Sequence, residues 1–200
     1  MSTDVMVDNV YMTQDVGTRA RLVQAGVELL EDGGLPAVGL RAITRAAGVS
    51  HGAPRRYFPT HRALLAAIAE AGFADLRAEL EPALSGSGPA DPTGARARLL
   101  EMAGLYVAFA RRRPDMFALI FRHDLLEGAG ENLREKTVPV VAALAGLIGG
   151  QAETHRALGL WTSVHGIATL TSTRALDLFD ADVDALVAAA VDSVDAQRDS

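Results

Sequence analysis

Apolar residues recur every three or four positions along most of this chain, the spacing that lines up one face of an α-helix. Leu22, Ala25 and Leu29 share such a face, whereas Glu28 and Asp32 fall outside it. No segment alternates apolar and polar residues as a half-buried β-strand does. The pattern therefore predicts an all-α fold of about nine helices.

Composition narrows the class of protein further. The 200 residues are 49% hydrophobic and 22% charged, which is ordinary for a folded chain, and they include no cysteine. Disulfides and thiolate metal sites are thereby excluded, and we expect neither a metal nor a cofactor. The longest apolar run, residues 138–150, contains Pro139 and is shorter than the roughly 20 residues that span a bilayer. Residues 1–15 do not resemble a secretion signal, so we expect a cytoplasmic protein.

Apolar spacing, glycines and prolines together set the predicted domains and helices. We expect a flexible tail over residues 1–16, a three-helix domain over 17–62 and a larger helical domain over 63–200. Residues 82–92 concentrate turn formers and are predicted to be a loop. The predicted helices cover residues 19–32, 40–47, 51–57, 61–80, 93–112, 114–123, 131–149, 153–178 and 182–197.

The N-terminal domain contains two short predicted helices around a glycine turn. The first, residues 40–47, ends at Gly48. Ser50 is expected to cap the second helix, and Thr60 the helix that follows it. Pro54 falls in the first turn of the second helix, where a missing N–H is tolerated. This arrangement predicts a helix-turn-helix motif, whose shape fits the major groove of DNA.

The motif lies in a cationic window inside an anionic chain. Residues 33–69 contain no acidic residue but five arginines and two histidines, while the whole chain carries −6. The window therefore holds +5 before any histidine titrates, and the remainder holds −11. Clustered positive charge attracts polyanions such as nucleic acid. The alternative is a solvated arginine surface with no partner, which the absence of counter-charges makes less favoured.

The second helix of the motif is expected to face outward, because Ile43, Val49 and Phe58 cover its inner side. Arginine binds guanine edges through two hydrogen bonds, and small residues let a helix approach the groove floor. Side chains on the preceding and following helices are expected to reach flanking phosphates. The predicted DNA-contacting residues are Arg41, Arg45, Ser50, His51, Gly52, Ala53, Arg55, Arg56, Tyr57 and His61.

Residues 40–68 resemble the N-terminal DNA-binding segment of the TetR family of one-component transcriptional regulators. The most specific elements are AAGVS, an aromatic-Phe pair and a Leu-Leu step, in LRAITRAAGVSHGAPRRYFPTHRALLAAI. Near the C-terminus, LWTSVHGIATL is similar to a branch of that family marked by Trp and then His-Gly, here Trp161, His165 and Gly166. The resemblance implies a homodimeric repressor that binds a palindromic operator and releases it when a small apolar effector enters the C-terminal helices.

Several positions depart from the usual pattern of the family, among them Gly39, which occupies a helix-cap position often filled by serine or threonine. Arg55 stands where a tyrosine usually contacts the DNA backbone, Tyr57 where a histidine is common, and His61 where a lysine usually meets a phosphate. These changes keep the DNA-binding class but leave the operator sequence open. They also motivate an alternative function, a small-molecule binding module that has lost specific DNA binding.

The C-terminal domain contains a cluster of aromatic and sulfur-containing side chains on two successive predicted helices. At helical spacing such side chains are first of all core, but an apolar cluster is also what a small-molecule pocket needs. The resemblance places an effector pocket among these helices, with Arg122, His123 and Asp124 as candidates for polar contacts. The predicted ligand-binding residues are Met102, Tyr106, Phe109, Phe117, Ile120, Phe121, Trp161 and His165, with Met116 in the same cluster.

Trp161 and His165 lie four residues apart and so share one helix face. His165 is open to three interpretations: a satisfied interior histidine, a ligand contact or a dimer contact. Small residues nearby let a second helix approach closely, which together with the last helix predicts a four-helix dimer interface. The predicted interface residues are Gly166, Thr169, Leu186, Val187 and Ala190.

No motif in the sequence indicates an enzyme. It contains no glycine-rich phosphate loop, nucleophile elbow or HExxH zinc motif. Three functions remain: a ligand-responsive regulator of transcription, which is favoured, a small-molecule binding module, and a helical protein–protein adaptor. DNA footprinting with a salt titration separates them, because binding to phosphates weakens steeply as salt rises.

Overall fold

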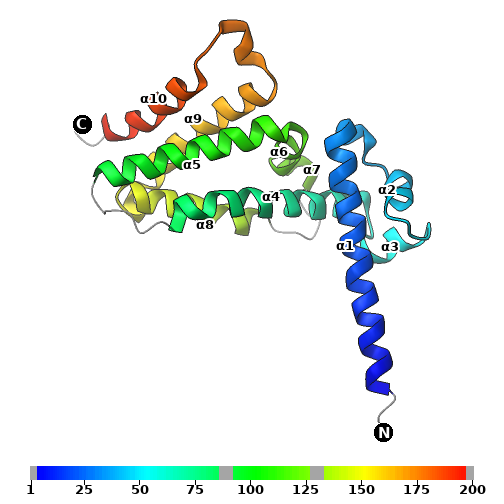
Figure 1. The fold of residues 1–200 in the computed structure, drawn as a ribbon. Helices are drawn as coiled ribbons and strands as arrows, with labels where there is room; N and C mark the ends of the chain where they lie inside the picture. The colour runs from blue at the N-terminus through cyan, green and yellow to red at the C-terminus, as the bar shows by residue number, and fades with distance from the viewer. Residues whose placement is uncertain (1–3, 86–91, 127–132, 197–200) are drawn as a thin grey trace. The chain divides into compact units, whose positions relative to one another are not determined.

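The computed structural model describes residues 4–85, 92–126 and 133–196, and these residues are helical throughout apart from turns and short links (Figure 1). The all-α prediction is confirmed. The α-helices of the described residues are α1 (Asp4–Ala37), α2 (Leu40–Ala46), α3 (Ala53–Tyr57), α4 (His61–Ser85), α5 (Pro92–Arg112), α6 (Pro114–Ile120), α7 (His123–Leu126), α8 (Leu133–Ile148), α9 (Thr154–Ser172) and α10 (Val183–Ala196). Two short 3-10 helices, η1 (Gln151–Glu153) and η2 (Ala175–Phe179), precede and follow α9.

The chain forms two compact units. Unit 1 comprises residues 1–72 and 119–131, and unit 2 comprises residues 73–118 and 132–200. Across the described ranges, no helix combines the length and the apolarity that a membrane span requires. The predicted domain limits at residues 16 and 62 stay predictions.

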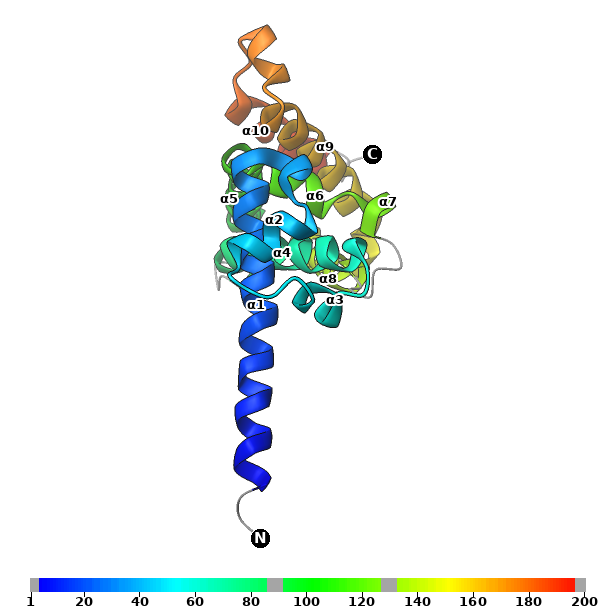
Figure 2. The ribbon, with the colours of Figure 1, turned by 90° about the vertical axis from the view of Figure 1, so that its right-hand side faces the viewer.

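In unit 1, α2 and α3 pack against α1 (Figure 2). Gly26 of α1 also permits a close approach of α4, because a Cβ atom there would lie 2.3 Å from Cδ1 of Ile68. Leu22, Leu30 and Ile43 are fully buried in this core. The core of unit 1 therefore fixes the two short helices of the predicted helix-turn-helix.

Helix α1 is longer than the sequence predicts. It begins at Asp4 instead of near Arg19, since no proline interrupts the preceding residues, and its helical path is broken at Gly34. The tail expected over residues 1–16 is thus helical from Asp4 onward, and its mobility stays a prediction. Residues 1–3 lie outside the described residues.

The turn between α2 and α3 follows the prediction in one respect and corrects it in another. Gly48 ends α2 with a φ of 62°, a conformation that favours glycine. Helix α3, however, begins at Ala53, and its N-cap is Gly52, with no side-chain cap. The expected cap by Ser50 was wrong, because His51 and Gly52 form a turn before the helix starts.

Helix α4 has the predicted cap but runs further than predicted. The Thr60 hydroxyl accepts a hydrogen bond from the N–H of Ala63 at 3.0 Å. Pro82 lies inside the helix and Pro92 begins α5, so the loop predicted over residues 82–92 was wrong for residues 82–85 and 92. Residues 86–91 lie outside the described residues. Arg98 explains the extension, since its guanidinium donates hydrogen bonds to the carbonyls of Ala83 and Leu84 at the end of the helix.

Unit 2 is organised around α9, which packs against α5, α8 and α10. Two predicted helices are each divided in the structure. The helix expected over residues 114–123 ends at Ile120 and is followed by α7, and the helix expected over 153–178 ends at Ser172. Hydroxyl side chains in the last turns of α9 bond back to its own carbonyls, as Thr169 and Thr173 do, which competes with further helical pairing.

Replacing Thr60 by alanine should lower the free energy of unfolding by about 1 kcal/mol, because the first turn of α4 loses its side-chain acceptor. Urea denaturation followed by circular dichroism measures this. Thr60→Ser keeps the hydroxyl and should stay close to the wild type. Equal stability of the alanine variant and the wild type would contradict this account of the cap.

Candidate functional site

The predicted DNA-contacting residues form an exposed basic surface on α2, α3 and the turn between them. Arg41 and Arg45 are exposed on α2, and Arg55 and Arg56 are exposed on α3. His51 lies in the connecting turn and is also exposed. Of the remaining predicted contacts, Ser50, Gly52 and His61 are exposed, and Ala53 and Tyr57 are half-buried.

Three apolar anchors explain why this surface faces outward. Ile43 is fully buried, Phe58 is 3% exposed, and Pro54 on α3 is buried as well. Thr44, the one buried polar side chain of the core among the described residues, donates its hydroxyl hydrogen bond to the carbonyl of Leu40 at 2.6 Å. With these residues facing inward, the arginines on the opposite sides of α2 and α3 face solvent.

Several arginines of this surface have no ion-pair partner among the residues that the structure describes. Arg41, Arg45 and Arg55 form no ion pair in the part of the chain that the structure describes. The guanidinium of Arg56 lies 5.9 Å from the centre of the Tyr57 ring. Such a surface is suited to anionic partners, because exposed guanidinium groups bind phosphates and guanine edges.

His61 has a structural contact that sequence reasoning missed. Its Nε2 lies 2.6 Å from the carbonyl oxygen of Val38. A carbonyl only accepts, so Nε2 carries the hydrogen and donates, which ties the start of α4 to the link between α1 and α2. Nothing in the sequence spacing points to this contact, because the two residues are 23 positions apart.

A second arrangement of interest lies in unit 2, where three helices bring an aromatic cluster together. The hydroxyl of Tyr106 on α5 lies 2.8 Å from Nδ1 of His165 on α9. Trp161 stacks on the His165 ring with centroids 5.2 Å apart, and Phe117 of α6 lies 5.4 Å from both Tyr106 and His165. The sequence predicted the members of this cluster but not the bond between Tyr106 and His165.

Burial keeps both polar members of this cluster neutral. It raises the pKa of the Tyr106 hydroxyl far above its usual value, against a smaller opposing effect of a hydrogen bond with Trp161. Burial also lowers the pKa of His165. Tyr106 therefore donates to an unprotonated Nδ1, and the imidazole carries its hydrogen on Nε2.

The structure unites part of the predicted ligand-binding set. Met102, Phe109 and Met116 are also buried and belong to unit 2, and Phe109 and Met116 are fully buried. Ile120 and Phe121 belong to unit 1, where Ile120 is buried and Phe121 is half-buried. Arg122 and Asp124 are exposed and pair with each other at 2.8 Å, which lowers the pKa of the Asp124 carboxyl. His123 is exposed as well.

The predicted dimer residues differ in accessibility. Thr169 and Leu186 are exposed, and Gly166 and Ala190 are half-buried. Val187 is only 5% exposed, since it packs inside unit 2.

Across the described residues, no three histidine, aspartate or glutamate side chains gather as a metal site requires.

Comparison with protein families gives two matches. Residues 22–68 match the model described as bacterial regulatory proteins, tetR family. Residues 99–194 match the model described as tetracyclin repressor-like, C-terminal domain. No curated protein sequence matches the chain.

Several solved structures share the fold. A protein with unknown function from Rhodococcus sp. RHA1 is 34% identical, with a TM-score of 0.72 over 88% of this chain and 93% of that one. A TetR-family transcriptional regulator from Streptomyces coelicolor is 20% identical, with a TM-score of 0.64 over 90% of this chain and 94% of that one. A variant of TetR from Acinetobacter baumannii AYE, in complex with minocycline, is 20% identical, with a TM-score of 0.63 over 90% and 97%.

The depressed pKa of His165 predicts a pH-dependent stability. The unfolded chain binds a proton near pH 6.5 that the folded chain resists, so the free energy of unfolding should fall as pH drops below about 6.5. His165→Asn retains an acceptor for Tyr106 but does not titrate, and should show a shallower decline. Urea midpoints of both proteins between pH 7.5 and pH 5 measure the difference, and parallel curves would contradict it.

Proposed function

Because this chain belongs to the TetR family of bacterial regulatory proteins, we propose that it is a repressor that binds a palindromic operator as a homodimer. The family consists of DNA-binding regulators with a ligand-binding C-terminal domain, and they are not enzymes. In this proposal a small apolar effector releases the operator. The protein acts in the cytoplasm, where bacterial DNA lies.

The observation that carries the proposal is the exposed basic surface of α2 and α3. Arg55 and Arg56 stand exposed on a short helix whose inner side is anchored by Pro54 and Phe58. We assign base contacts to α3 and to the turn before it. Arg41 and Arg45 on α2, with Ser50 and His61, are assigned to flanking phosphates.

In a homodimer, two copies of this surface can bind the two halves of a palindromic operator. The two copies of α3 would lie about 34–36 Å apart, so that they enter successive major grooves on one side of the duplex. We propose an interface of α9 and α10 that contains Gly166, Thr169, Leu186 and Ala190. Trp161, His165 and Gly166 support placing the chain in the family branch marked by Trp followed by His-Gly.

The effector is proposed to enter unit 2 beside Tyr106, Phe117 and His165. This region combines apolar side chains with one polar pair, the composition of small-molecule sites in general. The related TetR variant from Acinetobacter baumannii AYE binds minocycline, a small molecule, within the same fold. An effector changes operator affinity only if it binds the two conformations of the dimer unequally.

One observation favours the alternative, a small-molecule binding module without specific DNA binding. His61, which stands where the family usually has a phosphate-binding lysine, uses Nε2 for the carbonyl of Val38. Arg55 also replaces a tyrosine of the usual pattern. In this alternative the basic surface would bind DNA of any sequence weakly, without a defined operator.

Replacing Arg55 and Arg56 together by alanine should weaken binding to DNA from the chain's own upstream region by at least about tenfold, since each base or phosphate contact contributes about 1–3 kcal/mol. Fluorescence anisotropy of a labelled duplex at fixed salt measures it. Helicity should not change, because both side chains are exposed.

The matched control is Arg77→Ala, which removes an exposed arginine of α4 outside the basic surface. It should retain wild-type affinity for the same duplex. If the double variant binds as tightly as Arg77→Ala, the assigned surface is wrong.

A further inference from the structure

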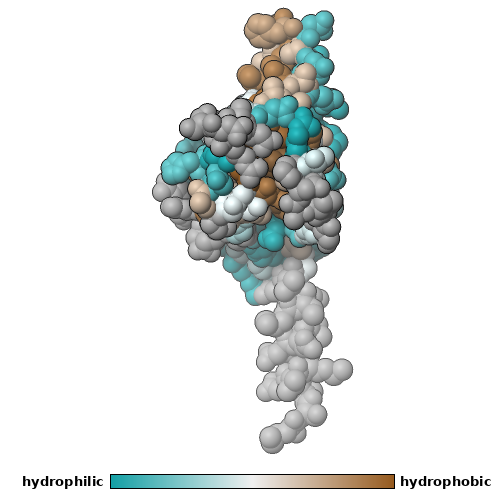
Figure 3. All heavy atoms as spheres, turned by 90° about the vertical axis from the view of Figure 1, so that its left-hand side faces the viewer, coloured by the Kyte–Doolittle hydropathy of each residue, from teal (hydrophilic) through white to brown (hydrophobic). Residues whose placement is uncertain are grey.

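The segment between α9 and α10 presents unusually exposed apolar side chains. Leu178 is 84% exposed and Phe179 is 78% exposed, more than any other large hydrophobic residue of the described ranges. We call residues 173–182 the arm. Hydrophobic side chains gather at its tip at the top of Figure 3, and the ribbon leads away from α9 before it returns as α10 (Figure 1).

The backbone of the arm adopts an energetically unfavourable conformation at two residues. Arg174 and Asp180, which flank η2, have φ angles of 59° and 50°. Non-glycine residues adopt such angles rarely. Nε of Arg174 also bonds Oδ2 of Asp177 at 2.8 Å. A strained segment that exposes two large apolar side chains indicates a surface that a partner covers.

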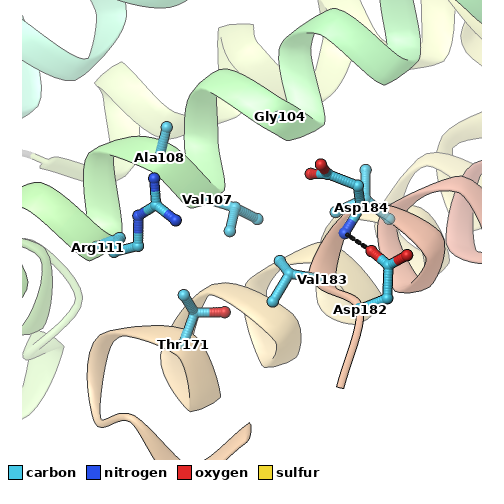
Figure 4. Close-up of a pocket in the computed structure, with 9 residues that line it drawn as sticks. Gly104, Val107, Ala108, Arg111, Thr171, Asp182, Val183 and Asp184 are labelled. Carbon is cyan, nitrogen blue, oxygen red and sulfur yellow. Dashed lines mark hydrogen bonds between the residues drawn. The ribbon is translucent and has the colours of Figure 1, made fainter. Parts of the chain in front are cut away.

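A groove that such a side chain fits, lined by both apolar and polar residues, lies in the same unit. Its volume is about 160 Å³, which is below the roughly 300–1,000 Å³ typical of small-molecule pockets but leaves room for one side chain. It lies between α5, the end of α9 and the start of α10 (Figure 4). It is lined by Gly104, Val107, Ala108, Arg111, Thr171, Asp182, Val183, Asp184 and Val187.

Arg111 is a cationic side chain of the groove, which Asp182 and Asp184 also line, and its charge is opposite to that of Asp180 at the tip of the arm. Arg111 is exposed at one end of the groove and forms no ion pair with another described residue (Figure 4). Asp180 follows Phe179 directly, is exposed, and likewise has no ion-pair partner in the described ranges. Asp182, at the other end, already accepts the N–H groups of Asp184 and Ala185. Arg111 is therefore the groove side chain whose charge is opposite to that of Asp180.

We propose that the arm of one copy docks on a second copy of this chain, with Phe179 in the groove and Asp180 paired with Arg111. The chain's own arm does not fill its groove, since Phe179 is exposed. Twofold symmetry makes the contact reciprocal, so each copy supplies one arm and one groove. Leu170 and Leu186, 46% and 38% exposed on α9 and α10, are available to the same partner. The inference rests on the proposed homodimer and names the contact that completes it.

The test is a charge swap followed by sedimentation equilibrium of the full-length chain. Arg111→Asp and Asp180→Arg should each weaken dimerisation at least about tenfold, because each places like charges in contact across the interface. The double variant restores opposite charges and should return the dissociation constant to within about threefold of the wild type. Single variants that dimerise like the wild type, or a double variant that shows no recovery, would overturn the proposal.

A second pair of variants tests the apolar part of the contact, in which Phe179 enters the groove. Phe179→Ser should weaken the dimer, while Val138→Ser, which alters a 57% exposed valine on α8, should not. Equal effects of the two would count against the groove as the site. Thermal melts by circular dichroism establish that each variant is folded.

The absence of cysteine from the chain allows a direct check of the contact. Under mild oxidation, a mixture of Phe179→Cys and Ala108→Cys proteins should form disulfide-linked dimers of one copy of each. A mixture that yields no such cross-link contradicts the proposed docking.

These experiments distinguish a failure of the proposed arm docking from a failure of the proposed repressor function. A dimer that binds its operator but ignores the charge swap refutes the arm alone. If the charge swap changes dimerisation as expected but the dimer binds no DNA, the repressor proposal is refuted and the docking of the arm is retained. A monomeric wild type refutes the arm outright.

Discussion

The basic surface depends on the burial of three side chains beneath it. Helix α3 has five residues, far fewer than the roughly 12–15 that an isolated helix needs to be stable in water. Its conformation is therefore held by Pro54 on the helix, Phe58 just after it and Ile43 on α2. Because these anchors face the core, Arg55 and Arg56 face solvent, and the function proposed for the chain follows from that orientation.

The distribution of charge along the sequence also favours binding of DNA by this surface. An acidic side chain among residues 33–69 could pair with the arginines and cancel their attraction for DNA, and the sequence has none there. Arginines of unit 2 do pair with acidic residues, Arg112 with Glu79 and Arg113 with Asp75. Such surface ion pairs contribute little to stability, about 0–1 kcal/mol each.

The sequence predicted the helices best where apolar periodicity and end signals agreed. Thr60 capped α4 as expected, and Gly48 ended α2. The predictions were wrong where a distant contact decided the outcome, as with Arg98, which completes the end of α4 beyond Pro82. The same limit applies to the site: exposure of the arginines followed from helical periodicity, but the contacts of His61 with Val38 and of Tyr106 with His165 join residues far apart in the chain.

The orientation of α3 toward the major groove is tested most directly by hydroxyl-radical footprinting of the wild-type protein on its own upstream DNA at low salt. The account predicts two protected half-sites whose centres lie about 10–10.5 base pairs apart, or a multiple of that spacing. Protection that is uniform along the duplex, or none at all, would contradict a dimer that reads an operator through α3.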